Sequence, residues 1–171
     1  MEEKPSTARI ALKWGLIIGI ASILFSTVLY ITEQVGNTAL SLIAYVIIIV
    51  GLVMAMREYR SLNNDYMSYG EGLGIGALTA GVSGILSSLY GVLYTNVIDP
   101  EFQSRMEDQM RVLYEERGMS DDQIDKAMEF ANMFQSPGLL FVFGVLGTIF
   151  MGFIFSLVIA AILRRNRPVF E

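Results

Sequence analysis

The side chains that most often carry out chemistry in proteins are scarce in this sequence. Its 171 residues include no histidine and no cysteine, which removes the commonest general base near neutral pH and every thiolate nucleophile or sulfur ligand. Serines gather at Ser83, Ser87 and Ser88, but no histidine or lysine lies nearby in the sequence to activate one of them. Thr79, Ser83 and Ser87 share a helix face, and we expect them to bond to backbone carbonyls or to a neighbouring helix.

Acidic side chains are the remaining candidates for metal binding or catalysis. Asp121, Asp122 and Asp125 could offer oxygen atoms to Ca²⁺, but they lack the alternating carboxylates and central glycine of an EF-hand loop. Helix capping and the helix dipole account for them, so we predict no metal site. No GxxxxGK[ST] loop occurs, and we predict no cofactor. The best catalytic pair, Glu71 and Asp99, falls at opposite ends of one apolar block, so we expect no catalytic residues and no enzyme activity.

The elements that would position these side chains are four apolar blocks, at about residues 14–31, 38–56, 72–97 and 139–163. Apolar residues make up 53% of the chain and charged residues 17%, and the mean hydropathy is +0.51. This composition is typical of multi-pass membrane proteins. Because lipid offers the backbone no hydrogen-bond partner, a spanning segment of this kind must be helical. The sequence therefore predicts an all-α polytopic protein, with one four-span membrane domain over residues 1–171.

The first block also allows a cleaved signal peptide as an alternative. Its uncharged run, Trp14–Ile31, is 18 residues long, whereas the apolar core of a signal peptide has about 7–15 residues and precedes an Ala-x-Ala site that is missing here. We therefore expect an uncleaved helix with Trp14 and Tyr30 at the two membrane interfaces. The short turn 32–37 returns the chain antiparallel.

Small residues recur at every fourth position in the third and fourth blocks, which puts them on one helix face. The two ladders are Gly72, Gly76, Ala80, Gly84 and Ser88, then Gly144, Thr148, Gly152, Ser156 and Ala160. Small residues let helix backbones approach closely in a membrane. We predict that the two helices pack along these faces, either within one chain or between two chains. Gly15 and Gly19 form a further GxxxG pair in the first block.

Residues 99–135 are amphipathic, and we expect an extramembrane helical hairpin inserted between the third and fourth spans. Asp99 is expected to be the N-cap of its first helix and Pro100 the first helical residue. Gly118 is expected to end that helix, and Ser120 with Gln123 reads as a capping box that starts the second. Five methionines give the hairpin an adaptable apolar face: Met106, Met110, Met119, Met128 and Met133.

The distribution of charge predicts the orientation. Eight basic residues flank the spans on the side of both termini: Lys4, Arg9, Lys13, Arg57, Arg60, Arg164, Arg165 and Arg167. The opposite side carries four, all in the hairpin, together with ten acidic residues, which give the hairpin a net charge of −6. The positive-inside rule then places both termini in the cytoplasm and the hairpin outside. The pI of about 4.8 does not favour a nucleic-acid partner.

The polar segment between the second and third blocks combines Arg57, Arg60, Tyr69, Gly70 and Glu71. Its tyrosines and charges fit an interfacial aromatic belt. The alternative is a site for lipid headgroups or for a partner at the membrane face. Arg57 or Arg60 is a candidate partner for Glu71.

Three ordered motifs carry a resemblance to a known family. They are Tyr69-Gly70-Glu71 at the start of a glycine-rich span, Ile98-Asp99-Pro100 after it, and Gly118-Met119-Ser120-Asp121 followed by Gln123-Ile124. With the four-span layout they resemble the bacterial family catalogued as domain of unknown function 4199, over nearly the whole chain. The resemblance implies a bacterial inner-membrane protein and no established activity. The recurrent positions Tyr69, Gly70, Glu71, Asp99 and Pro100 are functional or structural in that family.

We therefore expect a non-enzymatic integral membrane protein that acts through contacts with lipid or protein, as a homo-oligomer or with a membrane-protein partner. The alternative is a small oligomeric channel or carrier for an uncharged or weakly polar solute. In that case the serine, threonine and glycine faces of the third and fourth spans would line the path. No ionisable residue lies deep in a block, which argues against an ion-coupled transporter.

Overall fold

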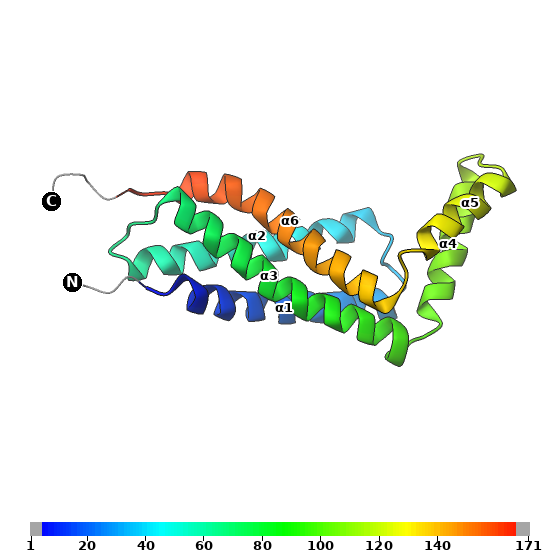
Figure 1. The fold of residues 1–171 in the computed structure, drawn as a ribbon, viewed down its shortest axis with the longest axis horizontal. Helices are drawn as coiled ribbons and strands as arrows, with labels where there is room; N and C mark the ends of the chain where they lie inside the picture. Colours follow the sequence, from blue (N-terminus) through cyan, green and yellow to red (C-terminus); the bar gives the residue numbers. More distant parts are fainter. Residues whose placement is uncertain (1–4, 167–171) are drawn as a thin grey trace. The chain divides into compact units, whose positions relative to one another are not determined.

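Four long helices dominate the computed structural model, which describes residues 5–166 (Figure 1). They are α1 (Thr7–Ile31), α2 (Thr38–Leu62), α3 (Tyr69–Leu93) and α6 (Pro137–Leu163), and a π-helical turn, η1 (Tyr94–Ile98), extends α3. Each of the four is long and apolar enough to cross a membrane. Within the described residues every other named element is also helical, and the only strand-like pairing is an isolated bridge between Met67 and Arg165. The predicted all-α class is confirmed.

The outer surfaces of these helices are apolar and exposed. Only 17–39% of each most apolar 18-residue window is buried. Leu24 on α1 is 65% exposed and Ile162 on α6 is 75% exposed. Apolar surface this extensive is unfavourable in water, and lipid is the solvent that suits it.

The helix ends differ in places from the expected blocks. α1 begins at Thr7, where Ser6 accepts a hydrogen bond from the Arg9 amide at 3.3 Å. α2 begins after its N-cap Asn37, as the short turn predicts, but continues to Leu62. Arg57 and Arg60 therefore lie on the last turns of a helix and not in a link. Lys4 and Arg167, which entered the charge comparison, lie outside the described residues.

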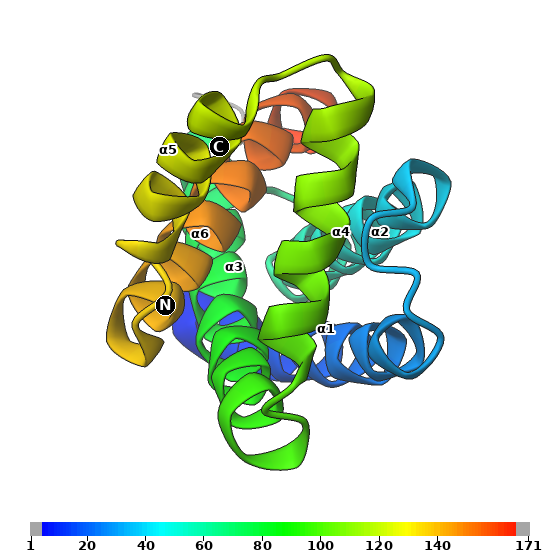
Figure 2. The same cartoon turned by 90° about the vertical axis from the view of Figure 1, so that its right-hand side faces the viewer.

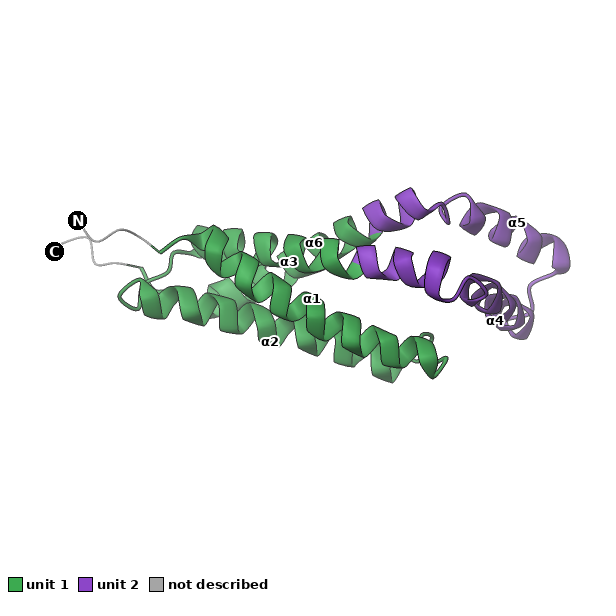
Figure 3. Ribbon diagram, turned by 90° about the horizontal axis from the view of Figure 1, so that it is seen from below, with its two compact units in different colours: residues 1–87, 144–171 green, residues 88–143 purple. Residues whose placement is uncertain are grey.

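The chain divides into two compact units, coloured separately in Figure 3. Unit 1 comprises residues 1–87 and 144–171, and unit 2 comprises residues 88–143. Unit 1 therefore holds α1, α2, most of α3 and most of α6. Unit 2 holds the end of α3, η1, the two short helices and the start of α6.

In unit 1, α1 packs against α2, and α3 lies beside α6 (Figures 1 and 2). The buried core lies where α1 begins and where α2 and α6 end. It comprises Ile10, Leu52, Ala55, Met56, Tyr59, Met67, Ile75, Ile159 and Ala160. All buried residues of α1 lie between Ile10 and Gly19, and those of α2 between Gly51 and Tyr59. The half of the α1–α2 pair nearest the Thr32–Asn37 turn is apolar but not buried in the chain.

Unit 2 contains the helical hairpin formed by α4 (Phe102–Glu116) and α5 (Asp121–Asn132). Gly118 follows the end of α4 with φ +76°, a left-handed conformation that favours glycine, and this confirms its predicted role. The capping box at the start of α5 is also confirmed, since the Gln123 side chain accepts from the Ser120 amide at 3.0 Å.

The expected start of the first hairpin helix was wrong. α4 begins at Phe102 with Glu101 at the N-cap, so neither Asp99 nor Pro100 has the predicted capping role. The chain first makes a turn in which the Phe102 amide donates to the Asp99 carbonyl at 3.1 Å. The Asp99 carboxylate instead accepts a hydrogen bond from Arg105 at 2.5 Å.

Candidate functional site

The two small-residue ladders face each other within unit 1. A Cβ added at Gly72 would lie 2.7 Å from Ala160 Cβ, and one added at Gly84 would lie 2.9 Å from Thr148 Cβ. Between these pairs, Gly76 lies against Ser156 and Gly152 against Ala80. Each step of four residues along α3 matches a step of four back along α6, so the pairs form one antiparallel register within a single chain. That the small residues of the ladders are required for this helix contact stays a prediction.

The outermost ladder members fall in different units. Ser88 belongs to unit 2. Gly144 belongs to unit 1, where its carbonyl accepts a hydrogen bond from Thr148 Oγ1 at 2.8 Å.

Several hydroxyls of the ladder helices bond to the backbone of their own helix. Ser156 Oγ donates to the Gly152 carbonyl at 2.7 Å, and Ser83 Oγ donates to the Ala80 carbonyl at 3.1 Å. Thr79 differs from them, because it is fully buried and its Oγ1 has no hydrogen-bond partner within residues 5–166. A buried polar group in this state costs free energy.

The GxxxG pair of the first block lies against α3. A Cβ at Gly15 would lie 2.5 Å from Val82 Cβ, and one at Gly19 would lie 2.7 Å from Leu86 Cδ2. α3 therefore contacts α1 on one side and α6 on another, through small residues in both cases.

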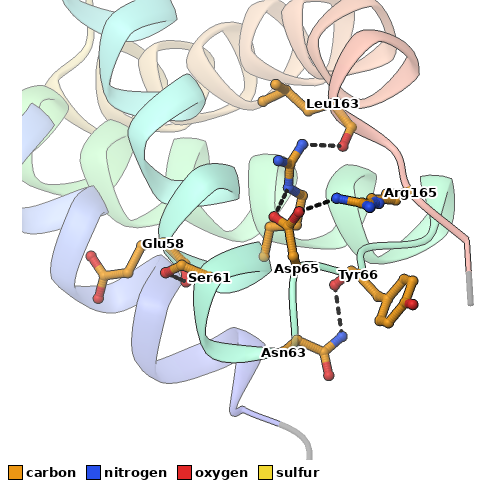
Figure 4. Close-up of polar contacts among 8 residues, drawn as sticks. Glu58, Ser61, Asn63, Asp65, Tyr66, Leu163 and Arg165 are labelled. Atoms are coloured by element: carbon orange, nitrogen blue, oxygen red, sulfur yellow. Dashed lines mark hydrogen bonds and ion pairs between the residues drawn. The ribbon is translucent and has the colours of Figure 1, made fainter.

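A cluster of charged side chains joins the α2–α3 link to the chain just after α6 (Figure 4). Asp65 accepts from Arg60 Nε at 2.7 Å and also from Arg165. Arg60 donates in addition to the Leu163 carbonyl at 3.3 Å. The hydrogen bond from Arg60 and the nearby charges of both arginines hold the pKa of Asp65 below its ordinary value of 3.8. Asp65 is therefore charged throughout the physiological range.

Backbone hydrogen bonds reinforce the same junction. The Met67 amide donates to the Arg165 carbonyl at 2.9 Å, and the Arg165 amide donates to the Met67 carbonyl at 2.8 Å. Met67 itself is fully buried in the core. The end of α6 is thus fixed to the link by two backbone bonds and by side-chain ion pairs.

A second charged group joins α1 to α2. Glu58 accepts from Lys13 Nζ at 2.8 Å and from the Trp14 indole N–H at 2.7 Å. Sequence reasoning did not single out Glu58. Lys13 and Glu58 lie at similar distances along the chain from the Thr32–Asn37 turn, and this symmetry of an antiparallel pair was the signal available.

The predicted interface motif is divided between the two units. In unit 1, the Glu71 carboxylate accepts from the Ser68 amide at 2.8 Å, as expected at a helix start. Tyr69 donates its hydroxyl to the Leu157 carbonyl at 3.4 Å, and Gly70 has open space around it. Asp99 and Pro100 belong to unit 2.

Acidic residues do not converge on a common point in the described part of the chain. Within residues 5–166 no three Asp or Glu side chains are arranged to hold a metal ion. Asp125, one of the three residues considered for Ca²⁺, accepts a hydrogen bond from Arg111 at 2.8 Å across the hairpin.

Unit 2 contains an apolar pocket of about 240 Å³ between the hairpin helices. Its main lining residues are Phe102, Met106, Met110, Met128, Ala131 and Leu140. Exposed apolar side chains also lie on α4 and α5, among them Val112 (53%) and Phe130 (65%). Three of the five methionines predicted to form an adaptable face, Met106, Met110 and Met128, thus line this pocket, whereas Met119 and Met133 do not.

Four apolar helices with exposed outer surfaces are the features of a helical membrane protein. The chain belongs to the DUF4199 family, described as a protein of unknown function, whose family model matches residues 13–165. No curated protein and no solved structure matches the chain.

Proposed function

We propose that this protein is a non-enzymatic integral protein of the bacterial inner membrane that acts by contacting another protein or lipid. The observation that carries the proposal is the hairpin of unit 2. Val112 and Leu113 on α4 and Phe130 on α5 are exposed, as are Met133 and Phe134 just after α5, and unit 2 also holds a methionine-lined pocket. Exposed apolar surface with adaptable methionine side chains is typical of surfaces that bind other proteins.

The proposed topology has four spans, both termini in the cytoplasm, and the α4–α5 hairpin outside the membrane. Its support is the excess of basic residues near the span ends on the side of the termini. A cysteine introduced at Gly118, in the hairpin turn, should react with a membrane-impermeant maleimide in intact cells. A cysteine at Asn64, in the α2–α3 link, should react only after the cells are opened. The reverse pattern would overturn the topology.

We propose that the protein is not an enzyme because its polar side chains bond to the backbone or to one another. Ser83, Thr148 and Ser156 donate to backbone carbonyls, and the carboxylates of Glu58, Asp65 and Asp99 accept from basic side chains. These groups stabilise the fold and are not arranged as a nucleophile with its base.

A photocrosslinking residue placed at Phe130 in living cells tests the proposed protein contact. The expected result is one discrete adduct, formed with a single other protein or with a second copy of this chain. The matched control is the same residue at Asp108, an exposed polar position on α4. Equal labelling at both positions, or no adduct at Phe130, would contradict a protein contact at this surface.

The second candidate function is an oligomeric channel or carrier for a weakly polar solute. The observation that favours it is the Thr79 hydroxyl, which is buried inside a spanning helix without a hydrogen-bond partner in residues 5–166. Against it, the glycine and serine faces proposed to line the path contact each other. Solute flux into liposomes that Thr79→Val alters would support this candidate, and flux equal to that of empty vesicles would remove it.

A further inference from the structure

A groove runs between α1 and α2 on the surface of unit 1, with a volume of about 310 Å³. Its lining includes Trp14, Ile17 and Ala21 of α1 and Val46, Val50 and Gly51 of α2. The floor is closed because the side chain of Ile18 occupies the space that a Cβ on Gly51 would need. The walls are open to the surroundings, since Ile17 is 46% exposed and Val46 and Val50 are each 55% exposed.

One end of this groove is polar and basic. Trp14 lines the groove and also donates its indole N–H to Glu58. Lys13 pairs with the same carboxylate, yet its side chain remains 55% exposed. Arg9 lies one helical turn before Lys13, and Arg57 precedes Glu58, and both are exposed. Three exposed basic residues therefore occur on the stretches of α1 and α2 that continue from this end of the groove, and the rest of the groove is lined by apolar side chains.

The groove is short and its lining is apolar. From Trp14 to Ala21, α1 rises through seven residue steps, or about 10 Å, and the side chains that line this length from both helices are apolar. In a membrane, lipid acyl chains surround apolar helix surfaces of this kind. A single extended hydrocarbon chain is the occupant that matches such a groove.

We propose that this groove binds one acyl chain of an anionic phospholipid, whose phosphate lies beside Lys13, Arg9 and Arg57. The inference rests on the proposed location of α1 and α2 in a membrane. The apolar walls select a hydrocarbon chain, and the basic end selects a negatively charged headgroup over a zwitterionic one. Trp14 marks the boundary between the two parts, because its ring borders the groove and its N–H contacts the polar group.

Glu58 sets the strength of the headgroup preference. The Glu58 carboxylate forms an ion pair with the Lys13 ammonium at 2.8 Å. It therefore competes with the lipid phosphate for Lys13. Glu58→Gln keeps a hydrogen-bond acceptor for Trp14 but removes the negative charge, and it should raise the preference for anionic lipid. Lys13→Gln should lower it about fivefold, the effect of removing one basic residue beside an anionic lipid surface.

Lipid binding to the purified full-length protein in detergent tests the proposal. Native mass spectrometry would compare phosphatidylglycerol with phosphatidylcholine of identical acyl chains. We expect more phosphatidylglycerol to be retained by the unaltered protein, and opposite shifts of that ratio for Lys13→Gln and Glu58→Gln. Equal retention of both lipids, or a ratio that neither substitution changes, would overturn the headgroup assignment.

Variants that fill the groove test the acyl-chain site. Ala21→Phe and Val50→Phe approach the groove from different helices and should both reduce retention of the two lipids. The matched control is Ala161→Phe, at an exposed alanine on α6, which should leave retention unchanged. If the unaltered protein were a dimer, and Ala21→Phe and Val50→Phe made it monomeric without reducing lipid retention, the occupant of the groove would be a second copy of this chain. That result would overturn the proposal. If the protein failed to fractionate with membranes, the proposed membrane location itself would be wrong, whatever the lipid result.

Discussion

Asp65 and Arg165 form an ion pair although 100 positions of the sequence separate them. The pair links the α2–α3 connection to the chain that follows α6, and Arg60 shares the same carboxylate at 2.7 Å. It lies beside the backbone bridge between Met67 and Arg165. Side chains and backbone together therefore fix the end of the last long helix against the rest of unit 1.

Asp65→Asn should release this junction without unfolding the helices. The amide group cannot pair as an ion with Arg60 or Arg165, so the bridge from Met67 to Arg165 should open more often. Hydrogen exchange of the Met67 and Arg165 amides should accelerate, while exchange in the middle of α1 and α2 stays unchanged. Asp108→Asn, at an exposed acid of unit 2, is the control. Unchanged exchange at both bridge amides would show that the ion pairs do not stabilise the junction.

The same junction should respond to acid. Because the folded state lowers the pKa of Asp65, its contribution to stability is complete above the ordinary value of 3.8 and is lost as the pH falls through the lower folded value. Protection of the Met67 and Arg165 amides should therefore decrease below about pH 3.8 in the unaltered protein. Asp65→Asn should lack this acid step. An identical step in both proteins would assign it to other carboxylates.

Gly76→Ala should destabilise the contact between α3 and α6. The new methyl group would overlap Ser156 Oγ, and overpacking of this kind costs about 1–3 kcal/mol. Gly74→Ala is the matched control two residues earlier, where a Cβ meets nothing within 4 Å, and it should be neutral or stabilising by up to about 1 kcal/mol. Reversible unfolding in mixed detergent micelles would give both values. Equal effects of the two substitutions would contradict the packed register.

Asp99→Asn separates the observed role of Asp99 from the one expected from the sequence. Asparagine caps helices as well as aspartate does, so a capping role predicts no loss of stability. An ion pair with Arg105 predicts a loss of about 0.2–1 kcal/mol, because both side chains are partly exposed. Hydrogen exchange of the α4 amides would report it, and Arg105→Gln completes a double-mutant cycle. Additive effects of the two substitutions would rule out the pairing.

The sequence determined the features that depend on local pattern. Runs of apolar residues without charge predict helices long enough to span a bilayer, because backbone groups in lipid must bond within their own segment. The left-handed turn at Gly118 and the capping box at Ser120 also follow from neighbouring residues. Spacing by four residues placed Gly76 and Ser156 each on a helix face, but could not say which residues would meet.

Tertiary structure decided the pairings between distant residues. The register that sets Gly76 against Ser156 depends on how α3 and α6 pack side by side. The ion pairs of Glu58 with Lys13 and of Asp65 with Arg165 likewise join residues that are 45 and 100 positions apart in the sequence. The role of Asp99 also could not be predicted from the sequence, although its partner Arg105 is only six residues away. A capping residue and an ion-pairing residue have the same side chain, and only the path of the backbone, with its turn from Asp99 to Phe102, brought Arg105 within reach.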